Sequence, residues 1–111
     1  MYEVKSIIRP ERLAAVVQAL HDIPDVPGLT VSVVRGFGRR TAAAATPGNP
    51  EYGETEMAKL ETVVPEELLQ RVVDTLHEVA GTGRPGDGKV FIIRVEDAMK
   101  IRSGARGSSV L

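Results

Sequence analysis

The spacing of apolar residues predicts a strand followed by a helix at the start of the chain. Apolar, often β-branched residues alternate with polar ones over residues 2–8, as in a strand with one buried face. A helix is predicted over residues 10–22, because Pro10 suits a first helical turn and apolar residues then recur at intervals of three and four. The apolar face of this helix comprises Leu13, Val16, Val17 and Leu20.

The same order of elements returns in the second half of the chain. Strands are predicted over residues 29–34, with a continuation to Gly38, and over residues 60–64 and 90–95. A second helix begins at Pro65, where two following glutamates interact favourably with the N-terminal end of the helix dipole. The apolar face of this helix comprises Leu68, Leu69, Val72, Val73, Leu76 and Val79.

Two β-α-β halves joined by a loop predict a single α+β domain over residues 1–111. The order is that of a ferredoxin-like split βαβ fold, in which two helices cover one face of a four-stranded antiparallel sheet. Each strand also contains two adjacent apolar residues, whose side chains point to opposite faces. These pairs are Ile7 and Ile8, Val33 and Val34, Val63 and Val64, and Ile92 and Ile93. Strands that are apolar on both faces predict oligomerisation through the face that the helices leave open.

Residues 39–56 interrupt this pattern. They contain a run of alanines together with prolines and glycines, without apolar periodicity, which predicts a long exposed loop. A structureless loop of this length in a compact domain is usually functional or disordered. Tyr52 in this loop is a candidate contact for a partner protein and a candidate modification site.

Composition narrows the classes of function. Fourteen basic and fifteen acidic residues give a net charge of −1, which argues against general nucleic-acid binding. The absence of cysteine excludes disulfides and thiolate metal sites, and two isolated histidines, His21 and His77, predict no metal centre. Neither a signal peptide nor an apolar run long enough to cross a membrane is recognisable, so we expect a cytoplasmic protein without direct membrane insertion.

Residues 82–89 are the most informative segment for function. They contain three glycines, an arginine and Lys89, and they lead directly into an apolar strand. Glycines allow backbone N–H groups to converge on one point, and a lysine beside them adds positive charge, which suits a phosphate. The spacing from Gly83 to Lys89 is that of a Walker A loop, but Val90 replaces the Ser or Thr that would hold magnesium, and a strand follows instead of a helix. This excludes a P-loop NTPase and leaves two readings open, a phosphate-cradling loop and a simple glycine-rich connection.

Two further segments, residues 35–40 and 100–102, concentrate positive charge. In the split βαβ topology the end of the second strand and the start of the fourth can belong to one edge of a cleft. The C-terminal basic segment can reach that edge within a subunit or across an interface. Three converging cationic groups favour a di- or triphosphate ligand, whereas each group taken alone is more typical of a solvated surface run.

These segments resemble the PII signal-transduction protein family over nearly the whole chain. The similarity is strongest over residues 82–91, TGRPGDGKVF, which resembles the family's C-terminal signature. The supporting matches are Ile7-Ile8-Arg9-Pro10 with Leu13, Gly36-Phe37-Gly38-Arg39, Val63-Val64-Pro65, and Ile101-Arg102-Ser103-Gly104. The resemblance implies a homotrimeric regulator, not an enzyme and without catalytic residues, that binds ATP, ADP or AMP in three inter-subunit clefts.

The resemblance also implies roles for individual segments and residues. Residues 39–56 would be the T-loop that contacts a target protein, either a membrane transporter or a metabolic enzyme, and residues 82–89 the phosphate-binding B-loop, with a C-terminal segment over residues 100–111. The phosphates would be held by Gly86, Asp87, Gly88 and Lys89, and paired with Arg39, Lys100 and Arg102. The adenine would be surrounded by Ile7, Thr30, Glu61, Val63 and Val64, with Gly36 and Gly38 completing the nucleotide site.

Two residues depart from the family pattern. Arg40 stands where related proteins have a glutamine that helps to hold magnesium and 2-oxoglutarate, and Met57 stands where they have a lysine that pairs with 2-oxoglutarate. Arg40 would repel magnesium and attract a second anion directly. We therefore expect a response to ADP or AMP together with a small anion such as bicarbonate, as in PII-like proteins associated with carboxysomes and bicarbonate uptake.

Three alternatives remain at the level of sequence. A conventional 2-oxoglutarate-sensing nitrogen regulator would bind magnesium-ATP more tightly when 2-oxoglutarate is present. A small ferredoxin-like phosphotransferase or phosphatase, using Lys89 and Asp87, would turn ATP over. A trimeric scaffold or metal-tolerance protein of similar architecture would have negligible nucleotide affinity.

Overall fold

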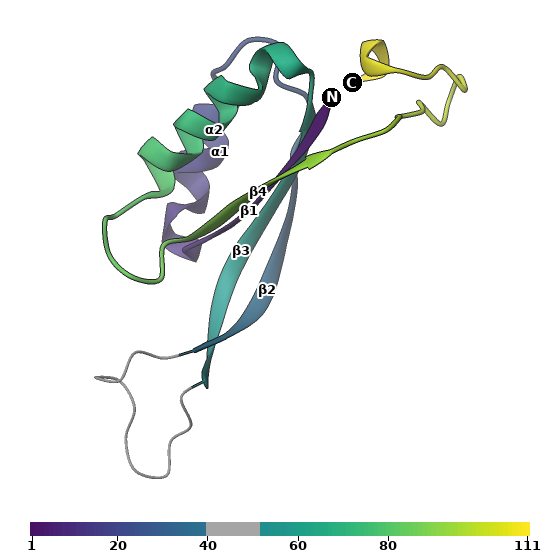
Figure 1. Cartoon of the computed structure of the whole chain (residues 1–111). Helices are drawn as coiled ribbons and strands as arrows, with labels where there is room; N and C mark the ends of the chain where they lie inside the picture. Colours follow the sequence, from purple (N-terminus) through teal and green to yellow (C-terminus); the bar gives the residue numbers. More distant parts are fainter. Residues whose placement is uncertain (40–51) are drawn as a thin grey trace, which may run out of the picture.

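The computed structural model describes residues 1–39 and 52–111 (Figure 1). Its elements are β1 (Tyr2–Ile8), η1 (Pro10–Arg12), α1 (Leu13–His21), β2 (Thr30–Arg39), β3 (Tyr52–Val64), α2 (Glu66–Ala80), β4 (Gly88–Arg94) and η3 (Ser108–Val110). Both predicted helices and all four predicted strands are present. Among the described residues, no helix combines the length and the apolar character needed to span a lipid bilayer.

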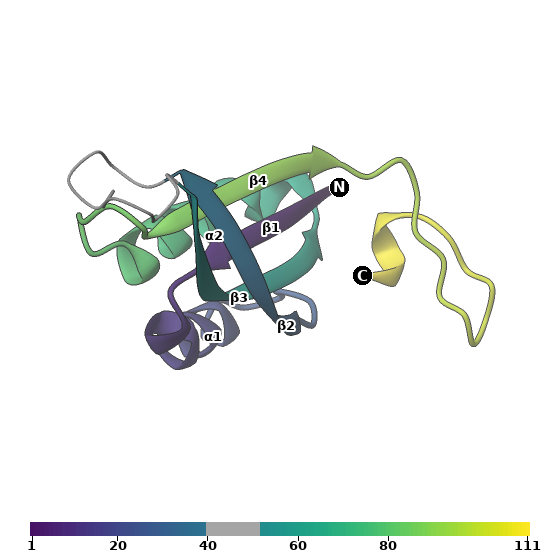
Figure 2. The same ribbon diagram turned by 90° about the horizontal axis from the view of Figure 1, so that it is seen from below.

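The four strands form one antiparallel sheet in the order β2-β3-β1-β4. Helices α1 and α2 lie side by side and cover one face of this sheet, while the other face is open (Figures 1 and 2). This arrangement confirms the predicted ferredoxin-like split βαβ topology. The two edge strands are β2 and β4, and β3 and β1 lie between them. This order determines which of the predicted site residues can lie close together within one chain.

Alternation along the two central strands builds the core. From Val4 in β1 and from Ala58 in β3, every second side chain turns toward the helices and is buried, and these meet the buried side chains of α1 and α2. The buried residues are Val4, Ser6 and Ile8 of β1, Ala58, Leu60, Thr62 and Val64 of β3, Val16 and Leu20 of α1, and Val72, Leu76 and Ala80 of α2. The predicted helix faces therefore pack as the sequence pattern indicates.

The open face of the sheet carries one member of each predicted apolar pair, namely Ile7, Val34, Val63 and Ile93. Lys5, Lys59 and Glu61 also lie on it, because they alternate with the buried residues of β1 and β3. Lys59 Nζ lies 3.3 Å from Glu61 Oε1, and both side chains are about one-third exposed. Charged pairs of this kind suit a face that stays partly hydrated or faces another polar surface.

The loop predicted over residues 39–56 is shorter in the structure, because both of its ends belong to strands. Strand β2 extends to Arg39 and β3 begins at Tyr52, eight residues before the predicted strand. These extensions pair with each other as a two-stranded ribbon that projects beyond the sheet, and Arg35 Nη1 and Glu54 Oε1 form a cross-strand ion pair of 3.0 Å (Figure 1). Arg35, Phe37 and the residues from Glu54 to Glu56 are exposed. The sequence of the ribbon therefore shows no apolar alternation and predicts a loop. Residues 40–51, which include Arg40, lie outside the described residues.

Candidate functional site

The glycine-rich segment connects the C-terminal end of α2 to the first residue of β4. Gly83, Gly86 and Gly88 have φ values of +80°, +93° and +99°, a region that L side chains rarely adopt. At Gly88 a Cβ atom would lie only 1.7 Å from the carbonyl oxygen of Ile7, so the loop enters β4 in direct contact with the backbone of β1. The glycines are therefore required by backbone geometry, as the sequence predicts.

The carboxylate of Asp87 organises this loop from within. It accepts hydrogen bonds from Arg9 Nε (2.9 Å), from the backbone N–H groups of Thr82 (2.8 Å) and Gly83 (2.9 Å), and from the Thr82 hydroxyl. The Arg9 guanidinium, followed by the Thr82 and Gly83 donors, holds the pKa of Asp87 well below its usual range. A carboxylate engaged by this many donors is a poor general base, which argues against the phosphatase alternative.

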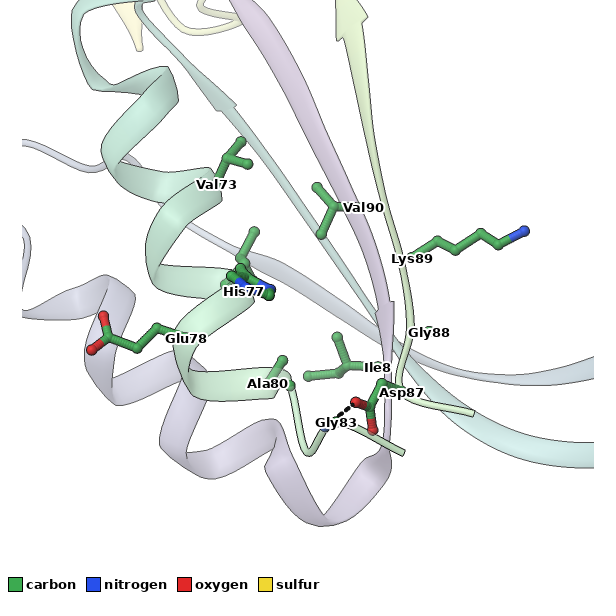
Figure 3. A pocket seen from close by; sticks show the side chains of 12 residues that line it. Ile8, Val73, His77, Glu78, Ala80, Gly83, Asp87, Gly88, Lys89 and Val90 are labelled. Atoms are coloured by element: carbon green, nitrogen blue, oxygen red, sulfur yellow. Dashed lines mark hydrogen bonds between the residues drawn. The ribbon is translucent and has the colours of Figure 1, made fainter. Parts of the chain in front are cut away.

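A cavity of about 580 Å³ lies between the loop, α2 and β4 (Figure 3). Its wall is largely apolar, and its polar lining groups come from α2, the loop and the start of β4. The residues named in Figure 3 are Ile8, Val73, His77, Glu78, Ala80, Gly83, Asp87, Gly88, Lys89 and Val90. The Lys89 side chain points away from α2, so its ammonium lies outside the apolar part of this cavity (Figure 3).

Lys89 stands in a row of residues across the open face of the sheet. It pairs with Ile7 on β1, which pairs with Lys59 on β3, which in turn pairs with Ser32 on β2. Lys89 is exposed, and within residues 1–39 and 52–111 no carboxylate lies at ion-pair distance from it. The structure thus places Ile7 and Lys89 side by side with an exposed ammonium available to an anion.

Three of the residues that the resemblance assigns to the adenine gather elsewhere on the sheet. Thr30 and Glu61 are direct partners across β2 and β3, and with Val63 they line a cavity of about 290 Å³. A side-chain hydrogen bond with Glu3, followed by one with Lys59, lowers the pKa of Glu61. The other residues lining this cavity are Glu3, Pro27, Gly28, Thr62 and Leu111.

Val64 has a different position from its neighbour in sequence. Its side chain is fully buried beneath the helices, because adjacent residues of a strand face opposite ways and Val63 takes the open face. Only the backbone of Val64 is therefore accessible to a ligand on the open face.

The described parts of the three cationic segments do not meet within one chain. The end of β2, with Gly36, Gly38 and Arg39, and the start of β4 share one end of the sheet but occupy its two opposite edges. The predicted single cleft edge is therefore wrong for one chain, because the width of β3 and β1 separates them. The segment after β4, which contains Lys100 and Arg102, lies at the other end of the sheet from the glycine loop (Figures 1 and 2).

Asp97 holds the C-terminal segment in a compact excursion. Its Oδ1 accepts the backbone N–H groups of Ala98 (2.8 Å) and Gly107 (3.2 Å), and Arg106 Nε donates to its Oδ2 at 2.7 Å. The Ala98 N–H, followed by the Arg106 side chain, lowers the pKa of Asp97. The Lys100 N–H donates to the Ala105 carbonyl at 2.8 Å, which closes the turn that carries the exposed basic residues.

Two residues that matter here have no signal in the hydropathy pattern. Arg9 and Asp97 act through contacts to distant or irregular segments, and neither lies on an amphipathic face. Arg9 does fall within the motif Ile7-Ile8-Arg9-Pro10, which is the one sequence feature that points to it. In the parts of the chain that the structure describes, no group of three or more potential metal ligands occurs.

The lowered pKa of Asp87 predicts how its contribution to stability changes with pH. Asp87→Asn is expected to lower the melting temperature relative to the parent protein by a constant amount from pH 8 to pH 5. The folded-state pKa lies below that of the unfolded chain, which is about 3.9, so the contribution is complete above that value and is lost as the pH falls further. Thermal melts of both proteins from pH 8 to pH 3 measure the difference. Asp74→Asn on the exposed side of α2 is the matched control, and a difference that grows below pH 4 would contradict the assignment.

Comparisons with known proteins cover the whole fold. The family model described as nitrogen regulatory protein P-II matches residues 1–105. The nitrogen regulatory protein P-II of Rhodospirillum rubrum is 35% identical over 113 residues, which span 100% of both chains. Among solved structures, a B. subtilis GlnK-ATP complex has a TM-score of 0.85 at 33% identity and covers 99% of this chain and 94% of its own. Arabidopsis thaliana PII bound to citrate has a TM-score of 0.79 at 37% identity, covering 97% and 89%.

Proposed function

The chain belongs to the nitrogen regulatory protein P-II family, and on this basis we propose that it is a cytoplasmic regulator that binds adenine nucleotides and controls a target protein. The ligands are ATP, ADP and AMP, held in the clefts between the subunits of a homotrimer. The target is a membrane transporter or a metabolic enzyme, contacted through the segment over residues 39–56. The protein acts by binding and not by catalysis.

The observation that carries this proposal is the glycine loop with Lys89 beside it. The loop has an internally fixed conformation, and the adjacent ammonium is exposed without a partner carboxylate among the described residues. Such a combination of backbone N–H groups and a nearby point charge suits the phosphates of a nucleotide. The similar B. subtilis GlnK structure contains ATP, which agrees in ligand class. Because the Asp87 carboxylate is occupied within the loop, Asp87 would face a phosphate through its backbone.

The positions of the cationic segments favour sites between subunits. Since the end of β2 and the start of β4 lie on opposite edges of the sheet, they can share one ligand only if they come from different copies. Both edge strands expose apolar side chains that association would bury: Val31, Val33 and Phe37 on β2, and Phe91, Ile92 and Ile93 on β4. A ring of three copies joining unlike edges satisfies both requirements, and it lets Lys100 and Arg102 of one copy approach the loop of another.

The second ligand is proposed to be a small anion such as bicarbonate. The argument rests on Arg40 and Met57, which replace a magnesium-holding glutamine and a carboxylate-binding lysine in related proteins. Met57 lies on β3 opposite Val34, at the start of the projecting ribbon. A methionine there offers no charge to a second carboxylate, so 2-oxoglutarate loses one of its partners. The alternative, a regulator that senses 2-oxoglutarate, is distinguished from this proposal by the calorimetry described below.

The ribbon formed by β2 and β3 supplies the route from ligand to target. Its strands connect the sheet that carries the nucleotide residues with the segment over residues 40–51, so ligands at its base can select among conformations of that segment. A coupling free energy of about 1–3 kcal/mol between nucleotide and target would give a several-fold change in affinity.

Isothermal titration calorimetry of the purified protein tests the proposal. ATP, ADP and AMP are titrated, each with and without bicarbonate or 2-oxoglutarate and with and without magnesium. Tight ADP or AMP binding that bicarbonate shifts and 2-oxoglutarate does not would support the proposal. Magnesium-ATP binding strengthened by 2-oxoglutarate would instead identify a conventional nitrogen sensor, and ATP turnover would identify an enzyme. Absence of nucleotide binding would contradict the proposed function as a nucleotide-binding regulator.

Lys89→Ala is expected to weaken ATP binding by about tenfold or more, because a charge-assisted contact to phosphate is lost. Lys89 is exposed at the edge of the sheet, so the fold and the assembly should be retained. Calorimetry gives the affinity and size-exclusion chromatography the assembly. Arg71→Ala, which removes an exposed positive charge from α2, is the control and should bind ATP normally. If Lys89→Ala and Arg71→Ala bound ATP with equal affinity, the assignment of Lys89 to the phosphate site would be wrong.

A further inference from the structure

We infer that Arg9 is a positioning residue of the phosphate site, which holds the glycine loop in its binding conformation without contacting the nucleotide. The inference rests on the proposed function, because it concerns the same loop. It assigns a role to a residue of the β1–α1 connection that is 78 positions from its partner in the loop.

The guanidinium of Arg9 bonds to the loop at two points. Its Nε donates to Asp87 Oδ1 at 2.9 Å, and its Nη2 donates to the carbonyl oxygen of Pro85 at 2.7 Å. The two donors belong to one rigid planar group, so they fix the distance between Pro85 and Asp87 and bracket Gly86 between them. A Cβ at Gly86 would lie 3.4 Å from Arg9 Nη2, which shows how closely the guanidinium follows the loop backbone.

The base of Arg9 is itself held in place. It directly follows Ile8, which pairs with Gly88 at the start of β4, and it precedes Pro10 in an extended conformation with φ −61° and ψ +135°. A residue before proline is restricted to this region, so the side chain leaves the backbone in a defined direction. The ion-paired side chains of Arg9 and Asp87 are only 21% and 23% exposed, which limits competition from water.

Among the described residues, this contact is the hydrogen bond that reaches the part of the loop around Pro85. Asp87 already bonds to Thr82 and Gly83 on the α2 side of the loop, whereas the segment around Pro85 and Gly86 is exposed. Glycines with positive φ have many other conformations available when untied. If only a fraction of the molecules has the binding-competent loop, the apparent dissociation constant rises in inverse proportion to that fraction. Arg9 would therefore set nucleotide affinity by raising this fraction.

The role requires a guanidinium and not merely a positive charge. A lysine can place one ammonium near Asp87 but lacks the second donor in fixed geometry toward Pro85. Arg9→Lys is thus expected to fall between the parent protein and Arg9→Gln. A direct phosphate contact by Arg9 would predict otherwise, because lysine also binds phosphate as a point charge.

The test combines binding and amide exchange in four variants. Arg9→Gln, Asp87→Asn and the double variant probe the contact, and Arg12→Gln is the matched control, since Arg12 Nε donates to the Val79 carbonyl at 2.9 Å and not to the loop. Calorimetry measures ATP and adenosine binding. Hydrogen exchange on the nucleotide-free proteins measures protection of the Thr82 and Gly83 amides, because both donate to the Asp87 carboxylate that Arg9 holds in place.

We expect Arg9→Gln to weaken ATP binding by about tenfold or more and adenosine binding by less than about twofold. The same variant should exchange the loop amides faster, the double variant should bind ATP no more weakly than the weaker single variant, and Arg12→Gln should match the parent protein. Unchanged loop exchange in Arg9→Gln, equal losses for ATP and adenosine, or additive losses in the double variant would each overturn the inference. If the parent protein binds no ATP, the proposed function fails, and the exchange data still decide whether Arg9 orders the loop.

Discussion

Gly88→Ala is expected to abolish nucleotide binding and to lower the free energy of unfolding by about 4 kcal/mol or more. The new Cβ would lie 1.7 Å from the Ile7 carbonyl oxygen and 3.3 Å from the Ile8 Cα, and both belong to a central strand that cannot move aside. The φ of +99° adds strain of about 1–2 kcal/mol for any residue with a Cβ. Relief requires β4 to separate from β1 at its first rung, which displaces Lys89 and the end of the loop together. Urea denaturation and ATP calorimetry measure the two effects.

Gly83→Ala is the control that measures the effect of backbone strain without the steric clash with β1 expected in Gly88→Ala. Gly83 also has a positive φ, +80°, but within residues 1–39 and 52–111 nothing lies within 4 Å of its Cβ position. Its substitution should therefore lower the free energy of unfolding by only about 1–2 kcal/mol, the strain of the left-handed region alone. If the two variants were equally stable, the close approach of Gly88 to Ile7 would be refuted.

The parts of the fold predicted from sequence are those in which an element buries one face. Helix α2 shows this, because Val72 and Leu76 recur at helical spacing and each is less than 2% exposed. The predicted start of the helix at Pro65 lies one residue before the observed start at Glu66. A helix or strand that covers a core must repeat its apolar residues with its own period. The topology then follows from the order of elements.

The ribbon of β2 and β3 shows why the rest of the fold could not be predicted. Its residues are held by backbone pairing, from Arg35 with Glu56 to Arg39 with Tyr52, and not by burial. Backbone pairing of this kind leaves no pattern of apolar and polar residues in the sequence. The C-terminal excursion has the same property, since it depends on the Asp97 carboxylate and a single bridge between Met99 and Arg106.

For the candidate site, sequence predicts residue types better than their directions. The glycines and Lys89 were recognisable because positive φ and phosphate binding demand particular residues. The inward turn of Asp87 was not, because it depends on Arg9, a residue from the other half of the chain. Nor could the sequence show that the cationic segments occupy opposite edges of the sheet. The direction of Asp87 and the positions of the cationic segments both depend on how distant parts of the chain pack together.

Leu60→Ala is expected to lower the free energy of unfolding by about 3 kcal/mol, within the range of 2–5 kcal/mol for leucine truncation in a core. Leu60 is 2% exposed on central strand β3 and belongs to the core cluster that also contains buried residues of α1 and α2. The substitution therefore leaves a cavity that a strand in mid-sheet cannot move to fill. Ile101→Ala removes the same number of carbon atoms from a side chain that is 91% exposed, and it should change stability by less than about 0.5 kcal/mol. Urea denaturation at one fixed protein concentration compares the two, because association would make the stability of either variant depend on concentration. A loss for Ile101→Ala as large as that for Leu60→Ala would mean that another copy of the chain buries the tip of the C-terminal excursion.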